Sequence, residues 1–136
     1  VIALRLARAR VLRDGDMLRL YHETWNWGKV PVELRDCCNY AKDRHEGDYC
    51  YYFPSREQIL RHRVIVCTCF MGGGFRNMGL SGGDFHNFRL VIIDEAGQAT
   101  EPDCLAPAAS ALSPVDGRLV LCGDPKQLGP TVLSPQ

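Results

Sequence analysis

Two adjacent carboxylates stand where an apolar run stops. Asp94 and Glu95 directly follow residues 90–93, a Leu-Val-Ile-Ile stretch that is typical of a strand buried on both faces. Carboxylates in that position are not needed for solubility. Asp94 can hold a magnesium ion, mostly through water, while the ion bridges nucleotide phosphates, and Glu95 can polarise an attacking water. The alternative is that one of them merely caps the next helix, which would be the better explanation of an isolated pair.

A second polar motif weakens that alternative. Residues 123–130 read Gly-Asp-Pro-Lys-Gln-Leu-Gly-Pro and follow the next apolar run. The glycines and prolines fix a turn, and the Gln127 amide can both donate and accept, so it can contact a terminal phosphate and report its loss. A surface turn explains the glycines and prolines. It does not explain the pairing with Asp94 and Glu95 one crossover earlier.

The order of elements around these motifs predicts an α/β fold. Apolar and β-branched runs predict three strands, at residues 63–69, 89–93 and 119–122. A helix is predicted over 102–112, where Pro107 is expected to kink or shorten it. Strands that alternate with crossovers form a parallel sheet, whose ligands bind beyond the carboxyl ends of the strands. The polar motif after each strand, including Thr68 after the first, is therefore predicted to lie at one edge.

The first half of the chain gives weaker signals. Residues 22–53 show little periodicity and predict a long irregular connection, with at most one helical turn near 32–35. Ser55 is a candidate N-cap for the helix that follows it. The glycines of residues 72–83 predict a flexible connection, because the Gly-Lys-Ser/Thr sequence that a phosphate cradle needs does not follow them.

Length and composition limit the possible functions. The 136 residues suffice for one compact domain. The 16 basic and 16 acidic side chains cancel, so a surface for nucleic acid has to be local. No apolar run approaches the roughly 20 residues that cross a bilayer, so no membrane partner is expected. The sequence begins without Met and without a secretory signal, which we interpret as an internal piece of a longer protein.

The seven cysteines have no regular spacing and make a poor disulfide framework. Most lie in apolar segments, where a free thiol behaves as a small buried hydrophobe, and a reducing intracellular compartment fits best. The competing hypothesis is a zinc site built from Cys37, Cys38 and Cys50 with His45 or His62. It is disfavoured because adjacent cysteines chelate one tetrahedral ion poorly and no Cys-x-x-Cys pair occurs.

Together the two motifs resemble motifs II and III of superfamily-one helicases, in the group that contains the nonsense-mediated-decay RNA helicases. Motif II is Asp-Glu-Ala-Gly-Gln at 94–98, and motif III spans 123–130. Residues 30–40, Tyr-Tyr-Phe-Pro at 51–54 and the sequence after motif II are similar to the Armitage-type RNA helicases. These include the animal helicases named after Moloney leukaemia virus resistance and the plant silencing-defective proteins. The resemblance implies that residues 1–136 are part of a first RecA-like lobe, with an incomplete P-loop-type parallel sheet.

The resemblance also implies a role for each matching residue. Asp94 would bind magnesium through water, and Glu95 would act as the base for the attacking water. Gln127 would sense the γ-phosphate of ATP, and Gln98 would serve the nucleotide site or its link to motif III. Asp124 would help to couple motif III to motif II.

Residues 66–69, Val-Cys-Thr-Cys, resemble motif Ic of the family, in which Thr68 would touch the nucleic-acid backbone. The implied activity is hydrolysis of ATP with Mg²⁺, coupled to 5′ to 3′ unwinding of RNA in silencing and transposon control. The implied partners are RNA, single-stranded or duplex with an overhang, and silencing-complex proteins. A cytoplasmic location, extending to ribonucleoprotein granules, is expected. Because RNA rests on the resemblance alone, a DNA helicase of the same superfamily stays an alternative.

Several parts of the family pattern do not occur in the 136 residues. These are the phosphate loop Gly-x-x-x-x-Gly-Lys-Ser/Thr, the arginine finger and the other motifs of the second lobe. The isolated chain is therefore expected to hydrolyse ATP poorly or not at all. A second hypothesis follows, in which the chain is an inert nucleic-acid-binding or protein-interaction module derived from a helicase.

The irregular segment mixes aromatic and basic residues. They are Trp25, Trp27, Tyr49, Tyr51 and Tyr52, with Lys29, Arg35, Lys42 and Arg44. Such a mixture can stack on bases and neutralise phosphates. The alternative is that the aromatic rings anchor a long connection to the sheet.

Overall fold

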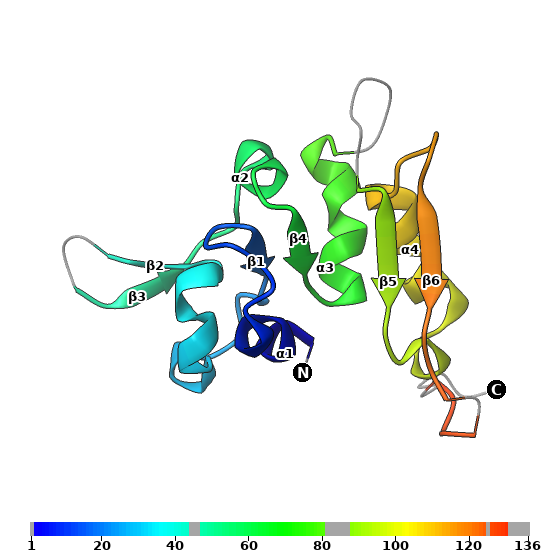
Figure 1. Ribbon diagram of the computed structural model, residues 1–136, viewed down its shortest axis with the longest axis horizontal. Helices are drawn as coiled ribbons and strands as arrows, with labels where there is room; N and C mark the ends of the chain where they lie inside the picture. The colour runs from blue at the N-terminus through cyan, green and yellow to red at the C-terminus, as the bar shows by residue number, and fades with distance from the viewer. Residues whose placement is uncertain (1, 44–46, 81–87, 125, 131–136) are drawn as a thin grey trace. The chain divides into compact units, whose positions relative to one another are not determined.

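The computed structural model describes residues 2–43, 47–80, 88–124 and 126–130 (Figure 1). They divide into two compact units, the first ending at Thr68 and the second beginning at Cys69, where the sequence predicts a single domain. Both units mix helices with strands, and each contains a parallel strand pair. The predicted α/β class with parallel sheets is therefore confirmed. Within these described ranges, no helix has the length and apolar character to span a membrane.

The first unit is built around a short parallel pair. In chain order its elements are α1 (Ile2–Ala9), β1 (Met17–Arg19), the 3₁₀ helices η1 (Trp27–Lys29) and η2 (Val32–Cys37), β2 (Tyr40–Lys42), β3 (Tyr49–Tyr51), α2 (Arg56–Leu60) and β4 (Val64–Val66). Strands β1 and β4 pair in parallel, with Leu18 opposite Ile65. Buried side chains from α1, β1, η2 and the start of β2 form the core of this unit.

The predicted N-cap at Ser55 is confirmed. The backbone N–H of Gln58 donates to the Ser55 hydroxyl over 3.3 Å, and the backbone N–H of Ser55 donates to Gln58 Oε1 over 2.7 Å. This reciprocal capping box satisfies two backbone donors that have no partner inside the helix. It fixes the start of α2, the helix that leads the chain into β4.

Residues 22–53 are more regular than the sequence predicts. The expected helical turn is present as η2, but β2 and β3 also form an antiparallel hairpin in which Tyr40 lies opposite Tyr51. The buried Asn39 ties this hairpin to the end of β1. Its Oδ1 accepts the Tyr21 N–H at 2.7 Å, and its Nδ2 donates to the carbonyl of Tyr21 at 3.0 Å.

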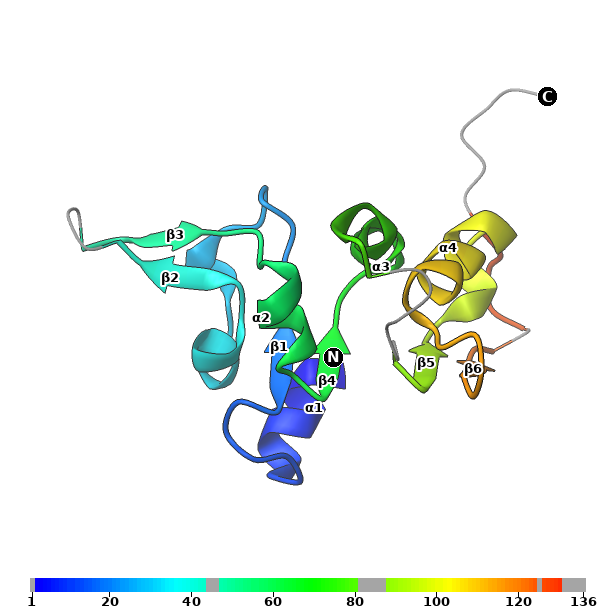
Figure 2. The ribbon, with the colours of Figure 1, turned by 90° about the horizontal axis from the view of Figure 1, so that it is seen from above.

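The second unit combines helices with the other parallel pair. Its elements are α3 (Cys69–Gly73), η3 (Gly74–Met78), β5 (Leu90–Ile93), η4 (Ala96–Gln98), α4 (Glu101–Ala111) and β6 (Arg118–Leu121). Strands β5 and β6 run parallel, with Ile93 opposite Leu121. Their arrows point the same way in Figure 1, and Figure 2 shows α3 and α4 on the same side of the pair.

The flexible connection predicted for the glycine-rich segment is wrong where the structure describes it. Residues 69–78 are helical, and Gly82 and Gly83 lie outside the described residues. A Cβ on Gly73 would lie 3.2 Å from the Cβ of Ala106, and Ser110 Oγ donates to the Gly73 carbonyl over 2.8 Å. Glycine here allows α3 and α4 to pack closely, which offsets its low helix propensity.

Two further expectations about the second unit need correction. Helix α4 is not cut short at Pro107: it begins after the N-cap Thr100 and continues to Ala111. The strands are also not buried on both faces, since Ile92 and Leu121 are each 57% exposed. In the part of the chain that the structure describes, β5 and β6 form a pair on their own, with helices on one side.

Candidate functional site

Motif II leaves β5 through a sharp turn. Asp94 and Glu95 follow the strand immediately, and both side chains are exposed. Glu95 has φ +56° and ψ +36°, the left-handed conformation that a residue with a Cβ rarely adopts. Its carbonyl accepts the N–H of Gln98 over 2.9 Å, which closes the turn into η4. The strained turn therefore presents both carboxylates at the carboxyl end of the strand pair.

Motif III lies backbone against backbone on motif II. The N–H of Cys122 donates to Ile93 and the N–H of Ala96 donates to Cys122, each over 2.8 Å, so the strand pairing continues into the turn. A Cβ on Gly123 would lie 3.1 Å from the nitrogen of Gly97 and 3.3 Å from that of Ala96. Only glycine fits there without displacing the motif II backbone. The predicted meeting of the two motifs at one sheet edge is thus observed.

A side-chain contact also joins the motifs. Gln98 Nε2 donates to Gln127 Oε1 over 3.0 Å, at an exposed position. This contact joins Gln98 of motif II to Gln127 of motif III, both of them predicted site residues.

The carboxylate of Asp124 forms a hydrogen bond within its own loop. Its Oδ1 accepts the Lys126 N–H over 2.9 Å, and its carbonyl accepts the Gln127 N–H over 3.1 Å. The approach of Asp124 to motif II is through its backbone carbonyl, 3.7 Å from the Cβ position of Gly97. Asp124 therefore shapes the turn that carries Gln127. The next motif residue, Pro125, lies outside the described residues.

Sequence reasoning missed a support beneath motif II. The buried thiol of Cys104 in α4 donates to the carbonyl of Ala96 across 3.8 Å. Thr100 Oγ1 accepts the backbone N–H of Asp103 over 3.4 Å and caps the same helix. The first turn of helix α4 therefore packs against the motif II turn and supports it. The sequence indicated only that Cys104 is a small buried residue.

The exposed carboxylates provide hard oxygen ligands of the kind that Mg²⁺ prefers. Within the described ranges, no three His, Cys, Asp or Glu side chains gather as a ready-made metal site. A magnesium ion at Asp94 would thus take most of its ligands from water and phosphate. His45, part of the zinc hypothesis, lies outside those ranges.

Thr68 does not belong to the same unit as motifs II and III. It is exposed and follows β4, which pairs with β1 in the first unit. Of the three strands predicted to share one sheet, β5 and β6 pair with each other, and the first, β4, pairs with β1. A three-residue strand carries too little pattern to specify its neighbour.

The aromatic residues of the first unit divide into two groups. Tyr40 is buried and Tyr51 packs against the core, as the anchoring explanation requires. Trp27 and Tyr49 stack with ring centroids 4.0 Å apart and planes at 12°, and Arg35 lies over the Trp27 ring at 5.0 Å. Tyr49 remains 44% exposed. This outer part of the cluster is therefore accessible to a ligand.

The two units carry opposite charge. The first has twelve Lys and Arg against nine Asp and Glu, and the second has four against seven. The zero net charge of the chain thus conceals a basic unit, which holds the aromatic cluster, and an acidic one, which holds the paired carboxylates.

The sequence matches a known family. A family model described as "AAA domain" matches residues 30–135, and the chain belongs to that family. It is 46% identical to "RNA helicase Mov10l1" of Mus musculus, over 98% of this chain and 10% of that protein. It is 40% identical to "Probable RNA helicase armi" of Drosophila melanogaster, over 98% of this chain and 12% of that protein.

A third relative is "Putative helicase mov-10-B.2" of Danio rerio, 36% identical over 86% of this chain and 11% of that protein. The chain spans about a tenth of the length of these curated relatives. No solved structure gives a significant match. The relatives confirm the resemblance to superfamily-one RNA helicases of the Armitage type.

Proposed function

We propose that the complete protein is an ATP-dependent RNA helicase and that the second unit forms half of its nucleotide site. The observation that carries this proposal is the direct contact between motif II and motif III. Gly123 meets the backbone of Ala96 and Gly97, and Gln98 is bonded to Gln127. A group that responds to the terminal phosphate is thereby linked to the carboxylates that serve hydrolysis. The relatives named RNA helicases support the choice of substrate.

Each side chain at the motif II edge has a task in this proposal. Asp94 holds a magnesium ion through water, and the ion when bound supplies the positive charge that offsets the phosphate oxygens. Glu95 orients the attacking water and accepts its proton at the carboxylate. Gln127 contacts the terminal phosphate through its amide, and Gln98 orients that amide through the 3.0 Å hydrogen bond. Asp124 fixes the turn that presents Gln127.

The RNA-facing part of the proposal belongs to the first unit. Thr68, exposed after β4, contacts the RNA backbone as motif Ic does in the family that the chain resembles. The excess of basic residues in this unit supports a polyanionic partner. Silencing-complex proteins as partners, and a cytoplasmic location that extends to ribonucleoprotein granules, complete the proposal on the strength of the resemblance.

The test is ATP hydrolysis by the complete protein with and without single-stranded RNA, and with DNA of the same sequence. The expected result is magnesium-dependent hydrolysis that RNA stimulates more than DNA does, together with unwinding of an RNA duplex that carries a 5′ overhang. Equal stimulation by DNA would support the DNA-helicase alternative. RNA binding without any hydrolysis would instead identify an inert binding module.

A further inference from the structure

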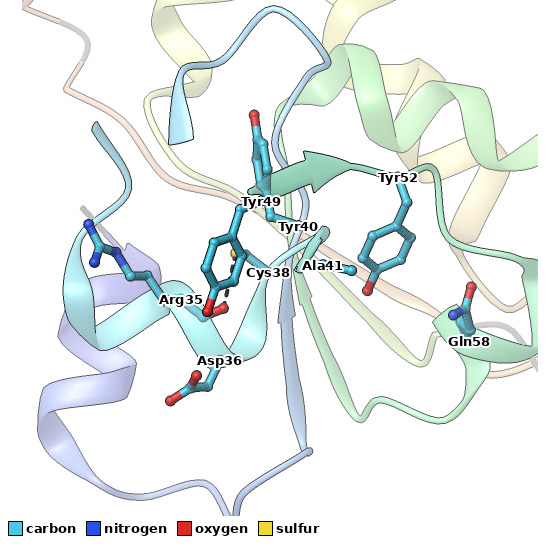
Figure 3. A pocket seen from close by; sticks show the side chains of 8 residues that line it. All are labelled: Arg35, Asp36, Cys38, Tyr40, Ala41, Tyr49, Tyr52 and Gln58. Atoms are coloured by element: carbon cyan, nitrogen blue, oxygen red, sulfur yellow. Dashed lines mark hydrogen bonds between the residues drawn. The ribbon is translucent and has the colours of Figure 1, made fainter. Parts of the chain in front are cut away.

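The first unit contains a pocket that no motif explains. Helix η2, the β2–β3 hairpin and the start of α2 border an open pocket of about 430 Å³, shown in Figure 3. The rings of Tyr49 and Tyr52 line it, with Ala41 between them, and the polar side chains of Asp36 and Gln58 lie at its margin. An aromatic wall with a few polar groups is the usual composition of a small-ligand site.

The Tyr49 ring is held in place by stacking on Trp27. Trp27 stacks on the Tyr49 ring at 4.0 Å, and Trp27 itself contacts the Tyr40 ring and the guanidinium of Arg35. Stacking between nearly parallel rings uses one face of each outer ring and leaves the other for a further planar group. Tyr49 is the outermost ring of this stack and is 44% exposed. One more planar group can therefore stack on the exposed Tyr49 ring.

The Tyr49 ring has two cationic neighbours, Lys42 and Arg35. Lys42 is its cross-strand partner in the hairpin, so both side chains project from the same face of β2–β3. Arg35 lines the same pocket from η2, where its Nε donates to the carbonyl of Val30 over 3.4 Å. The two cations suit a ligand that joins a flat ring to negatively charged phosphates.

The polar margin suits the edge of a base. Asp36 offers hydrogen-bond acceptors, and the amide of Gln58 carries both donor and acceptor groups. The capping box with Ser55 holds the Gln58 side chain in position. Nucleobases present donors and acceptors side by side on their edges, and proteins recognise them there in single strands.

We propose that this pocket receives one nucleotide of single-stranded RNA, whose base stacks on Tyr49 while its flanking phosphates meet Arg35 and Lys42. The proposal rests on the proposed function, in which the complete protein acts on RNA. It adds a specific contact in the first unit that belongs to none of the motifs. A peptide partner is disfavoured because the pocket combines an extendable ring stack with cations and lies on the basic unit.

The test is binding of a labelled oligouridylate of ~10 nucleotides, within the usual length range of single-strand sites, to the complete protein by fluorescence anisotropy. Tyr49→Ala is expected to weaken binding at least about fivefold, the lower end of what loss of one base stack causes. Tyr49→Phe keeps the ring and is expected to stay within about twofold of wild type, because stacking needs only the aromatic face. Lys42→Gln removes one phosphate contact. It is expected to reduce the slope of log affinity against log salt concentration by about 1.

The matched control is Phe53→Ala, which removes an aromatic side chain of similar exposure (50%) that does not line the pocket. It is expected to bind like wild type. Photocrosslinking of RNA that contains 4-thiouridine, followed by mass spectrometry, is expected to mark the β3 peptide. Circular dichroism of each variant shows whether it is folded.

The outcomes separate this inference from the proposed function. If the wild type binds RNA and hydrolyses ATP while folded Tyr49→Ala binds equally well, the pocket assignment is wrong and the helicase proposal stands. The pocket assignment is also wrong if Phe53→Ala loses as much affinity, or if the crosslink falls elsewhere. If the wild type does not bind RNA at all, both proposals are overturned.

Discussion

The side-chain amide of Gln98 donates a hydrogen bond to the side-chain oxygen of Gln127 across 3.0 Å, which joins motif II to motif III. Beneath it, the close approach of Gly123 to Ala96 joins the same segments through their backbones. Through these two contacts, a displacement of Gln127 would reach the turn that carries Asp94 and Glu95. This arrangement gives a physical route by which the state of a terminal phosphate can affect Glu95, the carboxylate that we propose as the catalytic base.

The first prediction concerns this amide pair. In the complete protein, Gln98→Ala and Gln127→Ala are each expected to lower the kcat of ATP hydrolysis, and the double variant to lose less than the sum of the two effects. The coupling free energy should be about 0.5–1.5 kcal/mol, the net value of one hydrogen bond. The control pairs Gln98→Ala with Asn77→Ala, which removes an exposed amide in η3. Additive losses in both pairs would show that the Gln98–Gln127 contact has no functional effect.

The second prediction concerns the close approach of Gly123. Gly123→Ala is expected to lower the free energy of local opening of the β5–β6 pair by about 1–2 kcal/mol, because the new Cβ would press on the backbone nitrogens of Ala96 and Gly97. Native-state hydrogen exchange of the Ala96 and Cys122 amides measures this opening. In the same motif, Gly129→Ala has no heavy atom within 4 Å of the new Cβ and should change protection by less than about 0.5 kcal/mol. Equal protection in both variants would contradict the steric argument.

The third prediction concerns the strained conformation of Glu95. Both Glu95→Gly and Glu95→Ala remove the carboxylate, but only glycine adopts φ +56° without steric cost. The glycine variant is therefore expected to be more stable than the alanine variant by about 1 kcal/mol in the same exchange measurement. If the Glu95→Ala variant is as stable as the Glu95→Gly variant, or more stable, this turn is unstrained. A more stable glycine variant would show that the natural residue retains strain for the sake of its side chain.

Much of the second unit follows from its sequence. Long apolar runs before Asp94 and before Gly123 predict strands, and a crossover between parallel strands forces their carboxyl ends to the same edge. The meeting of motifs II and III follows from these two facts. The Gln98–Gln127 distance, the left-handed Glu95 and the thiol of Cys104 behind Ala96 do not, because each depends on packing between segments that are distant in sequence.

The first unit was harder to predict for a different reason. The strands of the hairpin have three residues each, and Tyr40-Ala41-Lys42 shows no clear alternation of apolar and polar residues. Its position depends on the buried amide of Asn39, which bonds to the end of β1. Nothing in a polar Asn indicates that it will be buried. The sequence likewise could not tell which aromatic rings anchor the segment and which, like Tyr49, stay accessible.

The measurement that most directly tests the central claim is ATP turnover by the complete protein carrying Glu95→Gln. This change keeps the shape of the side chain and removes the proton acceptor, so ATP binding should persist while hydrolysis falls at least ~100-fold. Glu101→Gln, which alters an exposed Glu in the first turn of α4, is the matched control and should leave turnover within about twofold of wild type. Selective loss of hydrolysis in Glu95→Gln is the result that this account predicts. Undiminished turnover in that variant would contradict the assignment of Glu95 as the catalytic base.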